Sequence, residues 1–211
     1  MADGLPGHAS DRLSQPPLRI QGQKVVLREK RLEDAEDDYA WRSDPELAVF
    51  DAVAPLRTSL SDFLVIYREE LRYPSPRQRS LSIEDMDGVH IGNCMYYDVS
   101  EQKGQAELGI MIGRKDYWSQ GYGSDAVVTL VRHLFQTTIL NRVYLHTLKW
   151  NERAQKAFQK AGFTPIGETQ RNGQVFVAME IFRRQVALDG LEPDAEPSEA
   201  AGAAKADTKE P

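Results

Sequence analysis

Residues 106–126 read AELGIMIGRKDYWSQGYGSDA, and this stretch decides the fold. Its first part, 106–113, alternates as a strand does, with Leu108, Ile110 and Ile112 on one face. Gly109 and Gly113 mark where another group can approach its backbone. After the loop, apolar residues recur at helical spacing as far as residue 135. The sequence therefore predicts a strand, a glycine-containing loop and a helix.

The loop between the predicted strand and helix has the chemistry of an anion site. The first turn of a helix leaves its N–H groups unpaired and carries a charge of roughly +0.5. Gly121 and Gly123 lack a Cβ, so an anion can approach the backbone there, and Ser124 adds a hydroxyl donor. The loop predicts a seat for phosphate oxygens. The alternative is a glycine-rich turn that only starts the helix.

Two common nucleotide loops do not fit this stretch. A Walker loop requires a lysine after its glycines, and the dinucleotide fingerprint requires a third glycine where Ala126 stands. The loop resembles instead the acyl-CoA pyrophosphate loop Q/R-x-x-G-x-G/A of the GNAT N-acetyltransferase superfamily. Gln120 and Gly123 fill its first and fourth places, and Asp125 fills the sixth, where Gly or Ala is usual. Residues 118–126 are closer still to the form W-x-x-G-Y-[AG]-[ST]-[DE]-A, which resembles the subgroup that acetylates ribosomal-protein N-termini and spermidine.

A second block of resemblance lies downstream. Residues 151–163, NERAQKAFQKAGF, are similar to the family block N-x-x-A-x-x-x-[YF]-x-K-x-G-F. Asn151 is a favoured N-cap residue, and Gly162 is the expected stop of the same helix. The resemblance implies a second role for Asn151, a hydrogen bond to the pantetheine arm of coenzyme A. Both roles stay open from the sequence.

The resemblance implies that acetyl-CoA is the co-substrate and that its diphosphate lies on the glycine loop. It also implies that the pantetheine arm pairs with the strand before the loop, as a missing neighbouring strand would. The cofactor-binding residues implied in this way are Ile110, Met111, Ile112, Gln120, Gly121, Tyr122, Gly123, Ser124, Asp125, Asn151 and Phe158.

Glu107 is the candidate general base, acting directly or through a water. An amine is mostly protonated at neutral pH and must lose a proton before it attacks a thioester. Glu107 lies on the predicted strand, off its apolar face, and the subgroup often has Glu there. The alternative is an ion-paired or solvent-facing glutamate.

The general acid is open. Many relatives have Tyr at the position of Phe158, and phenylalanine cannot donate a proton. Tyr96, Tyr97 and Tyr117 are the phenols nearby in the sequence, which does not choose among them. The family transfers the acetyl group directly, so Cys94 is expected to be a buried structural thiol and not a nucleophile.

The flanking sequence supplies the rest of the fold. A short strand at 24–28 precedes a helix that runs to about residue 43 and a second helix that Ser59 or Ser61 caps. The apolar stripe expected on this second helix consists of Phe63, Ile66, Tyr67 and Leu71. A meander, the central helix, a strand, a helix and a hairpin follow. The predicted fold is α/β, in the α+β sense: a mixed, mostly antiparallel GNAT-type sheet of about seven strands flanked by about four helices.

The chain of 211 residues divides into three parts. We expect a flexible segment at 1–22, a single acetyltransferase domain at 23–187 and a disordered acidic tail at 188–211. The tail holds seven acidic residues against two lysines, which is −5 of the net −6. The domain is therefore close to neutral, and no basic face predicts binding to nucleic acid.

Other features predict a soluble cytoplasmic protein. The single cysteine suits a reducing compartment, and no apolar run reaches the ~18 residues of a membrane span. The four histidines are scattered without a paired spacing, which predicts no metal site. The acidic run at 33–38 either contributes to a pocket for a polycationic acceptor or is a solvated helix face.

The sequence thus predicts an N-acetyltransferase that moves acetyl from acetyl-CoA to a primary amine. The acceptor stays open between a protein N-terminus, a polyamine and another small amine or antibiotic. One alternative is a non-catalytic acyl-CoA-binding sensor or scaffold, and a weaker one is a nucleotide-binding α/β domain with affinity for ATP. A homo-oligomer is compatible with the sequence, which does not fix the oligomeric state.

Overall fold

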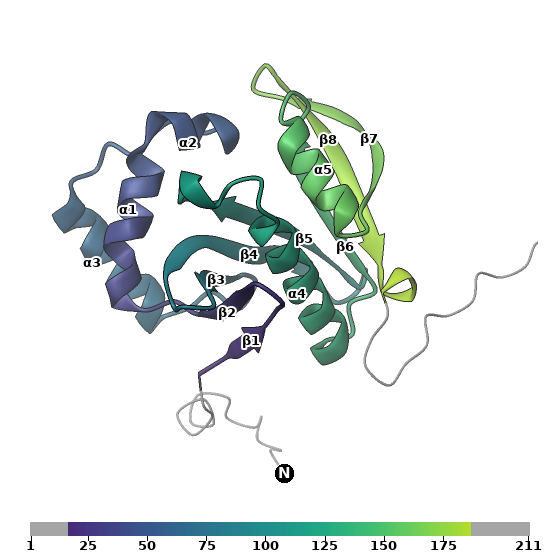
Figure 1. The fold of residues 1–211 in the computed structure, drawn as a ribbon, viewed down its shortest axis with the longest axis horizontal. Helices are drawn as coiled ribbons and strands as arrows, with labels where there is room; N and C mark the ends of the chain where they lie inside the picture. Colours follow the sequence, from purple (N-terminus) through teal and green to yellow (C-terminus); the bar gives the residue numbers. More distant parts are fainter. Residues whose placement is uncertain (1–16, 187–211) are drawn as a thin grey trace, which may run out of the picture.

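The computed structural model describes residues 17–186 of the chain. Within this range, eight strands form one sheet in the order β1-β2-β3-β4-β5-β6-β8-β7, and every neighbouring pair is antiparallel except β5 and β6 (Figure 1). The strands are β1 (Arg19–Gln21), β2 (Val25–Glu29), β3 (Arg79–Asp85), β4 (His90–Ser100), β5 (Gln105–Ile112), β6 (Arg142–Leu148), β7 (Thr164–Arg171) and β8 (Gln174–Phe182).

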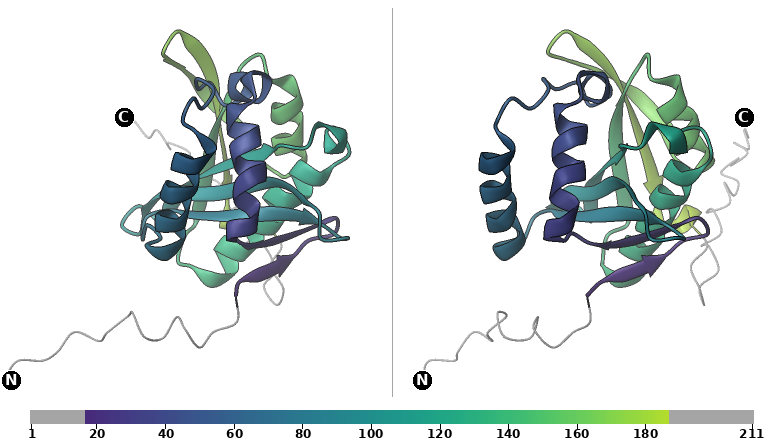
Figure 2. Two further views of the ribbon diagram at one scale, coloured as in Figure 1. Left: turned by 90° about the vertical axis from the view of Figure 1, so that its left-hand side faces the viewer. Right: turned by 60° about the vertical axis from the view of Figure 1, so that its left-hand side comes forward.

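The α-helices of the described range cover both faces of this sheet. They are α1 (Ala35–Ser43), α2 (Pro45–Phe50), α3 (Leu60–Arg72), α4 (Tyr122–Thr137) and α5 (Glu152–Lys160). Short 3₁₀ turns lie at Leu32–Asp34, Lys115–Tyr117 and Arg183–Gln185. Figure 2 shows the sheet between α1 and α3 on one side and α4 and α5 on the other. None of the helices within residues 17–186 has the length and apolar character needed to cross a bilayer.

This architecture confirms the predicted fold class, with one strand and one helix more than the sequence indicated. The extra strand is β1, which lies inside the segment predicted to be flexible at 1–22. Leu18 and Ile20 pack against the core, so ordered structure begins before residue 23. The rest of that segment up to residue 16, and the predicted acidic tail, lie outside the described range.

The extra helix, α2, starts directly after α1 ends. The helix that the sequence predicts to run to about residue 43 is α1, which ends at Ser43, directly before Asp44 and Pro45. The carboxylate of Asp44 then accepts the N–H of Glu46 at 2.7 Å, and Pro45 occupies the first helical position, where a missing N–H costs nothing. The same two residues therefore stop one helix and begin the next.

The main core lies between the sheet and α4. The α4 side chains predicted from the helical period are all buried there: Val127, Leu130, Val131, Leu134 and Phe135. Cys94 on β4 is fully buried in the same core, and this desolvation raises the pKa of its thiol to about 12. It is the neutral structural thiol that the sequence predicted.

On the other face, α3 packs against α1 through fewer residues than expected. Ser59 caps α3 by accepting the N–H of Asp62 at 3.2 Å, and Phe63 and Tyr67 are buried. Ile66, which the sequence placed on the same stripe, is instead 53 % exposed. The prediction was wrong because α3 packs chiefly on one helix, and a narrow stripe of residues four apart covers that interface.

Charged side chains are buried in pairs beneath α1. Arg28 on β2 donates to the two carboxylate oxygens of Asp34, each at 2.7 Å, and to Glu84 on β3 at 2.5 Å. Burial alone would raise the pKa of Asp34, but the hydrogen bonds from Arg28 hold it well below its ordinary value. Asp38 is also buried, and it accepts from Lys30. Two acids of the predicted acidic run are therefore used inside the protein.

Trp41 attaches α1 to the end of β5. Its indole lies so close to the backbone of Gly113 that a Cβ there would stand 2.0 Å from the ring. The sequence marked Gly113 as a place of close approach, and the structure identifies Trp41 as the approaching group. This contact fixes α1 over the far end of β5.

Gly113→Ala should destabilise the fold, because the added methyl group collides with the Trp41 ring. We expect the free energy of unfolding, measured in urea, to fall by about 1–3 kcal/mol, the usual cost of overpacking. Gly123→Ala is the matched control, since its Cβ would meet only the Ile112 side chain, at the ordinary distance of 3.6 Å. Equal stability of the two variants would contradict this packing.

Candidate active site

The parallel pair of strands opens after three residues. β5 and β6 pair over Gln105–Glu107 and Arg142–Tyr144 and then diverge (Figure 1). β5 continues along β4, and no other strand within residues 17–186 pairs with the opposite edge of its backbone over Leu108–Ile112. A cleft of about 2240 Å³ lies at this opening, lined by both strands and by residues of all five helices. Ile110, Met111 and Ile112, which the sequence predicted to bind the cofactor, lie on this unpaired stretch and line the cleft.

The N-terminus of α4 lies beside this opening. Gly121 precedes the helix with φ 90°, a left-handed conformation that favours glycine. Within the described residues, no side chain caps α4, and the first amide paired inside it is that of Asp125, which donates to the Gly121 carbonyl at 3.0 Å. The N–H groups of Tyr122, Gly123 and Ser124 precede it at the positive end of a 16-residue helix. This is the geometry that the glycine loop predicted.

Side chains hold this loop from outside. Gln120 donates to the carbonyl of Asp116, and Lys24 donates to the carbonyl of Gln120 at 2.9 Å. Tyr122 packs edge-on against Tyr117, with ring centroids 4.9 Å apart. The side chains of Gln120 and Tyr122 are therefore engaged in holding the loop. If these two residues contact a ligand, they would do so through their backbone groups.

Asp125 points away from the cleft. Its carboxylate accepts the N–H groups of Gln23, Lys24 and Val25 at 3.2, 2.7 and 3.1 Å. These three amides belong to the turn and start of strand that follow β1. The sequence predicted Asp125 as a cofactor-binding residue, and the structure corrects this, because its oxygens hold the β1–β2 turn and its own N–H is paired with Gly121.

Helix α5 forms the other wall of the opening. Asn151 caps it, with Oδ1 accepting the N–H of Ala154 at 3.2 Å, which confirms one of its two predicted roles. Ser124 donates its hydroxyl to the carbonyl of Ala157 at 3.3 Å, so α4 and α5 lie close together. Phe158 is buried beside them and lines the cleft.

An arginine between aromatic rings joins elements across the opening. The guanidinium carbon of Arg153 on α5 lies 3.6 Å from the ring centroid of Trp118 and 4.9 Å from that of Phe50 on α2. Trp118 also donates its indole N–H to the carbonyl of Ile112 at 2.7 Å. The loop before α4, the end of α2 and the start of α5 are linked in this way.

Glu107 lines the cleft from the face of β5 that is turned away from α4. Its side chain is 9 % exposed, and Oε1 lies 2.8 Å from Nδ1 of His146 on β6. The sheet register sets it opposite Tyr97 of β4 and Tyr144 of β6. The structure thus excludes a solvent-facing Glu107 and shows a largely buried, hydrogen-bonded carboxylate.

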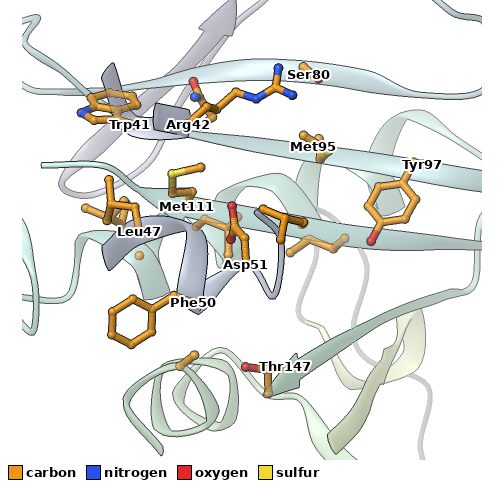
Figure 3. Close-up of a pocket in the computed structure, with 18 of the residues that line it drawn as sticks. Trp41, Arg42, Leu47, Phe50, Asp51, Ser80, Met95, Tyr97, Met111 and Thr147 are labelled. Carbon is orange, nitrogen blue, oxygen red and sulfur yellow. The ribbon is translucent and has the colours of Figure 1, made fainter. Parts of the chain in front are cut away.

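The three phenols left open by the sequence differ in position. Tyr117 donates its hydroxyl to Asp85 at 2.7 Å, and Tyr96 packs against the core on the other face of the sheet. Tyr97 shares the face of Glu107, and its hydroxyl points into the cleft (Figure 3). Burial and the charge of Glu107 raise the pKa of Tyr97, so it stays protonated at neutral pH.

The half of the cleft away from α4 mixes apolar and charged side chains. Its apolar lining includes Trp41, Leu47, Phe63, Met95 and Met111, and its charged lining includes Lys30, Arg42 and Asp51. Figure 3 shows several of these side chains around one space, with ribbon segments of α1, α2 and the central strands on different sides of it.

Asp51, directly after α2, is a charged group in this half that sequence reasoning missed. Its carboxylate points into the cleft (Figure 3). The carboxylate is in contact with solvent, but protein surrounds the space into which it points. This desolvation raises the pKa of the Asp51 carboxyl to about 6, although the positive charge of Arg42 acts to lower it. It is mostly ionised at pH 7. Asp followed by Pro is a helix-start signal, so Asp44 and Pro45 could have predicted α2 and the position of Asp51 directly after it.

His146 was also missed. Its partner Glu107 lies 39 residues away in the sequence, and only the pairing of β5 with β6 brings them together. Across residues 17–186, no group of three or more His, Cys, Asp or Glu side chains is placed to hold a metal ion.

The family can now be assigned. Residues 24–164 match the family model described as an acetyltransferase (GNAT) domain. The chain belongs to the GNAT acetyltransferase family. The resemblance seen in the glycine loop and in the block after Asn151 is thereby confirmed at the level of the family.

Similar proteins agree with this assignment. An uncharacterised N-acetyltransferase, p20, of Bacillus licheniformis is 26% identical over 173 residues, which cover 78% of this chain and 96% of that protein. The structure of spermidine N-acetyltransferase from Vibrio cholerae, in complex with CoA and spermine, has a TM-score of 0.68 at 18% identity and covers 77% of this chain and 97% of that one. The aminoglycoside acetyltransferase AAC(6′)-Ib, in complex with coenzyme A, has a TM-score of 0.63 at 20% identity, with coverages of 76% and 96%. These two structures share the GNAT fold with this chain.

Asp125→Ala should destabilise the protein without weakening its affinity for CoA. Three amides lose a charged acceptor, so we expect the free energy of unfolding in urea to fall by about 2 kcal/mol. Asp125→Asn, which keeps one acceptor oxygen, should lose less. Calorimetric titration with CoA completes the test. A variant that keeps its stability but no longer binds CoA would show that Asp125 binds the cofactor after all.

Proposed function

We propose that this protein transfers the acetyl group of acetyl-CoA to the primary amine of a small molecule or peptide. The free edge of β5 beside the uncapped start of α4 supports this most. The amides of residues 122–124 suit a diphosphate. A pantetheine arm carries two amide groups, which suit the free backbone edge of β5 as an added strand would. The thioester at the end of that arm would then lie near Glu107.

Residues of α5 fit the same ligand. Asn151 lines the cleft while its Oδ1 caps the helix, so its side-chain N–H groups are the ones left to donate to a pantetheine carbonyl. Phe158 supplies an apolar wall. We propose that Gly121, Gly123 and Ser124 contact the cofactor through their backbone.

Glu107 is the proposed general base. The acceptor amine must lose a proton before it attacks the thioester carbonyl. The Glu107 carboxylate takes this proton directly or through a water. The departing thiolate then needs a donor, and Tyr97 is the protonated phenol on the same face.

The acceptor we propose is a compact primary amine. Spermidine and aminoglycosides, named in the two similar structures, are amines, which supports that class. Asp51 offers a carboxylate to an ammonium group in the half of the cleft away from α4. Asp34 and Asp38 are paired inside the protein, so the acidic run argues less for a long polycation than the sequence allowed.

A non-catalytic acyl-CoA sensor is the second candidate, because Phe158 has no hydroxyl where many relatives have Tyr. An acceptor screen with acetyl-CoA separates the two. The panel includes spermidine, an aminoglycoside and peptides with free N-termini. Amine-dependent release of the CoA thiol supports transfer, whereas CoA binding without turnover across the panel supports the sensor.

Two properties of the whole protein remain part of the proposal. A cytoplasmic location agrees with the single cysteine, which suits a reducing compartment. A homo-oligomer remains a prediction, which light scattering measures directly.

Gly123→Glu should abolish CoA binding. The side chain would fill the space over the first-turn amides and add a negative charge beside the diphosphate. We expect calorimetry to show an affinity at least ~100-fold lower, as for a like charge in a buried anion site. Gly123→Ala, which adds only a methyl group, is the control and should lose far less. Unchanged affinity in the Glu variant would rule out this loop as the diphosphate seat.

Glu107→Gln should lower kcat about 10²- to 10⁴-fold at pH 7, the range expected for loss of a general base. Affinity for CoA should stay the same, because the carboxylate lies beyond the cofactor amides. Glu168→Gln, an exposed residue paired with Lys149, is the matched control. If steady-state turnover of Glu107→Gln equals that of the control at every pH, Glu107 is not the base.

A further inference from the structure

We propose that His146 and Arg171 position Glu107 for proton transfer: Arg171 holds the imidazole of His146, and the imidazole holds the carboxylate of Glu107. This inference rests on the proposed function of Glu107 as the base. In it, His146 and Arg171 touch no substrate and act through Glu107 alone.

The sheet register places these three side chains on one face. Glu107 and Tyr144 stand opposite each other in the last paired step of β5 and β6, and His146 follows two residues later on the same face. His146 is opposite Ala178 of β8, and the pairing of β8 with β7 continues this face to Arg171. Side chains from β5, β6 and β7 therefore meet on the cleft side of the sheet.

His146 lies within hydrogen-bond distance of both partners. Nδ1 is 2.8 Å from Oε1 of Glu107, and Nε2 is 3.2 Å from Nη2 of Arg171. A guanidinium can only donate, so Nε2 must accept and carries no proton. The proton of the neutral ring is then on Nδ1, where it donates to Glu107. The chemistry of arginine thus gives the chain a single direction, from Arg171 through His146 to Glu107.

This link lies where backbone support ends. Beyond Glu107, β5 and β6 are no longer paired, so a side-chain hydrogen bond joins the two strands at the start of the opening. Oε1 is fixed toward β6 by this bond. A general base must stand within hydrogen-bond reach of the proton it removes, and a carboxylate fixed at one oxygen presents the other in a constant direction.

The positions of the protons give a test that needs no activity. In the unaltered protein, the imidazole ¹⁵N resonances of His146 should show a neutral ring protonated at Nδ1. The resonances are assigned by their loss in His146→Asn. In Arg171→Met the Nε2 resonance should shift more than that of Nδ1, because Nε2 loses its donor while Nδ1 keeps Glu107. A ring protonated at Nε2 in the unaltered protein would overturn the proposal.

Steady-state kinetics test the consequence. His146→Phe removes both links and should lower kcat about 10- to 100-fold, the loss typical when a partner that orients a functional group is removed. The KM for the amine and the affinity for CoA should not change. His146→Asn, whose side-chain N–H lies near the position of Nδ1, should recover most of the rate.

Two matched controls separate positioning from a structural role. His133→Asn removes an imidazole from α4, outside the cleft lining, and Arg184→Met removes an exposed arginine. Both should leave kcat unchanged. A loss in His146→Phe that accompanies a lower Tm, raises the KM for the amine and is not recovered by His146→Asn would mean a structural role and overturn the proposal.

Failure of the proposed function has a different signature. In that case the unaltered protein binds no CoA, or no amine releases the thiol. The ¹⁵N measurement then still decides whether the Arg171–His146–Glu107 chain exists, since it depends only on the protein.

Discussion

The early end of pairing between β5 and β6 is the constraint on which the rest of the structure depends. The two strands can separate because each has a full antiparallel partner, β4 for β5 and β8 for β6. The core between the sheet and α4 also supports β5, through Ala106 and Leu108. A ladder continued past Glu107 would pair the backbone of residues 108–112 and close the cleft. Because the two strands separate, a few backbone hydrogen bonds between them are not formed, and one edge of β5 stays accessible from the cleft.

Two kinds of polar group face this opening, and they suit ligands of opposite charge. On the α4 side, the donors are backbone amides at the positive end of a helix, fixed by Gly121. On the other side, the lining includes the carboxylates of Glu107 and Asp51, with cations such as Arg42 nearby. Two further acids, Asp34 just before α1 and Asp38 within it, are paired with cations inside the protein. An anionic cofactor and a cationic acceptor would thus approach separate regions.

Sequence reasoning succeeded where the signal was local and repeated. The apolar period of α4, the alternation of β5 and the cap at Asn151 each involve residues within a few positions of one another, and each was confirmed. It failed at short elements. β1 has three residues and α2 has six, too few to show a period, so both were missed. It also failed for Ile66, whose exposure depends on how narrowly α3 meets α1.

The sequence by itself determined the glycine loop, the helix that it opens, the strand that carries Glu107 and the family to which they point. The tertiary structure alone set the direction of Asp125 toward the β1–β2 turn, the position of Tyr97 opposite Glu107, and the meeting of Glu107 with His146 and Arg171. The physical reason is range. A cap or a turn is satisfied by neighbours in the chain, whereas a carboxylate bonds whichever donor the sheet order brings near. For Asp125 that donor is about 100 residues away.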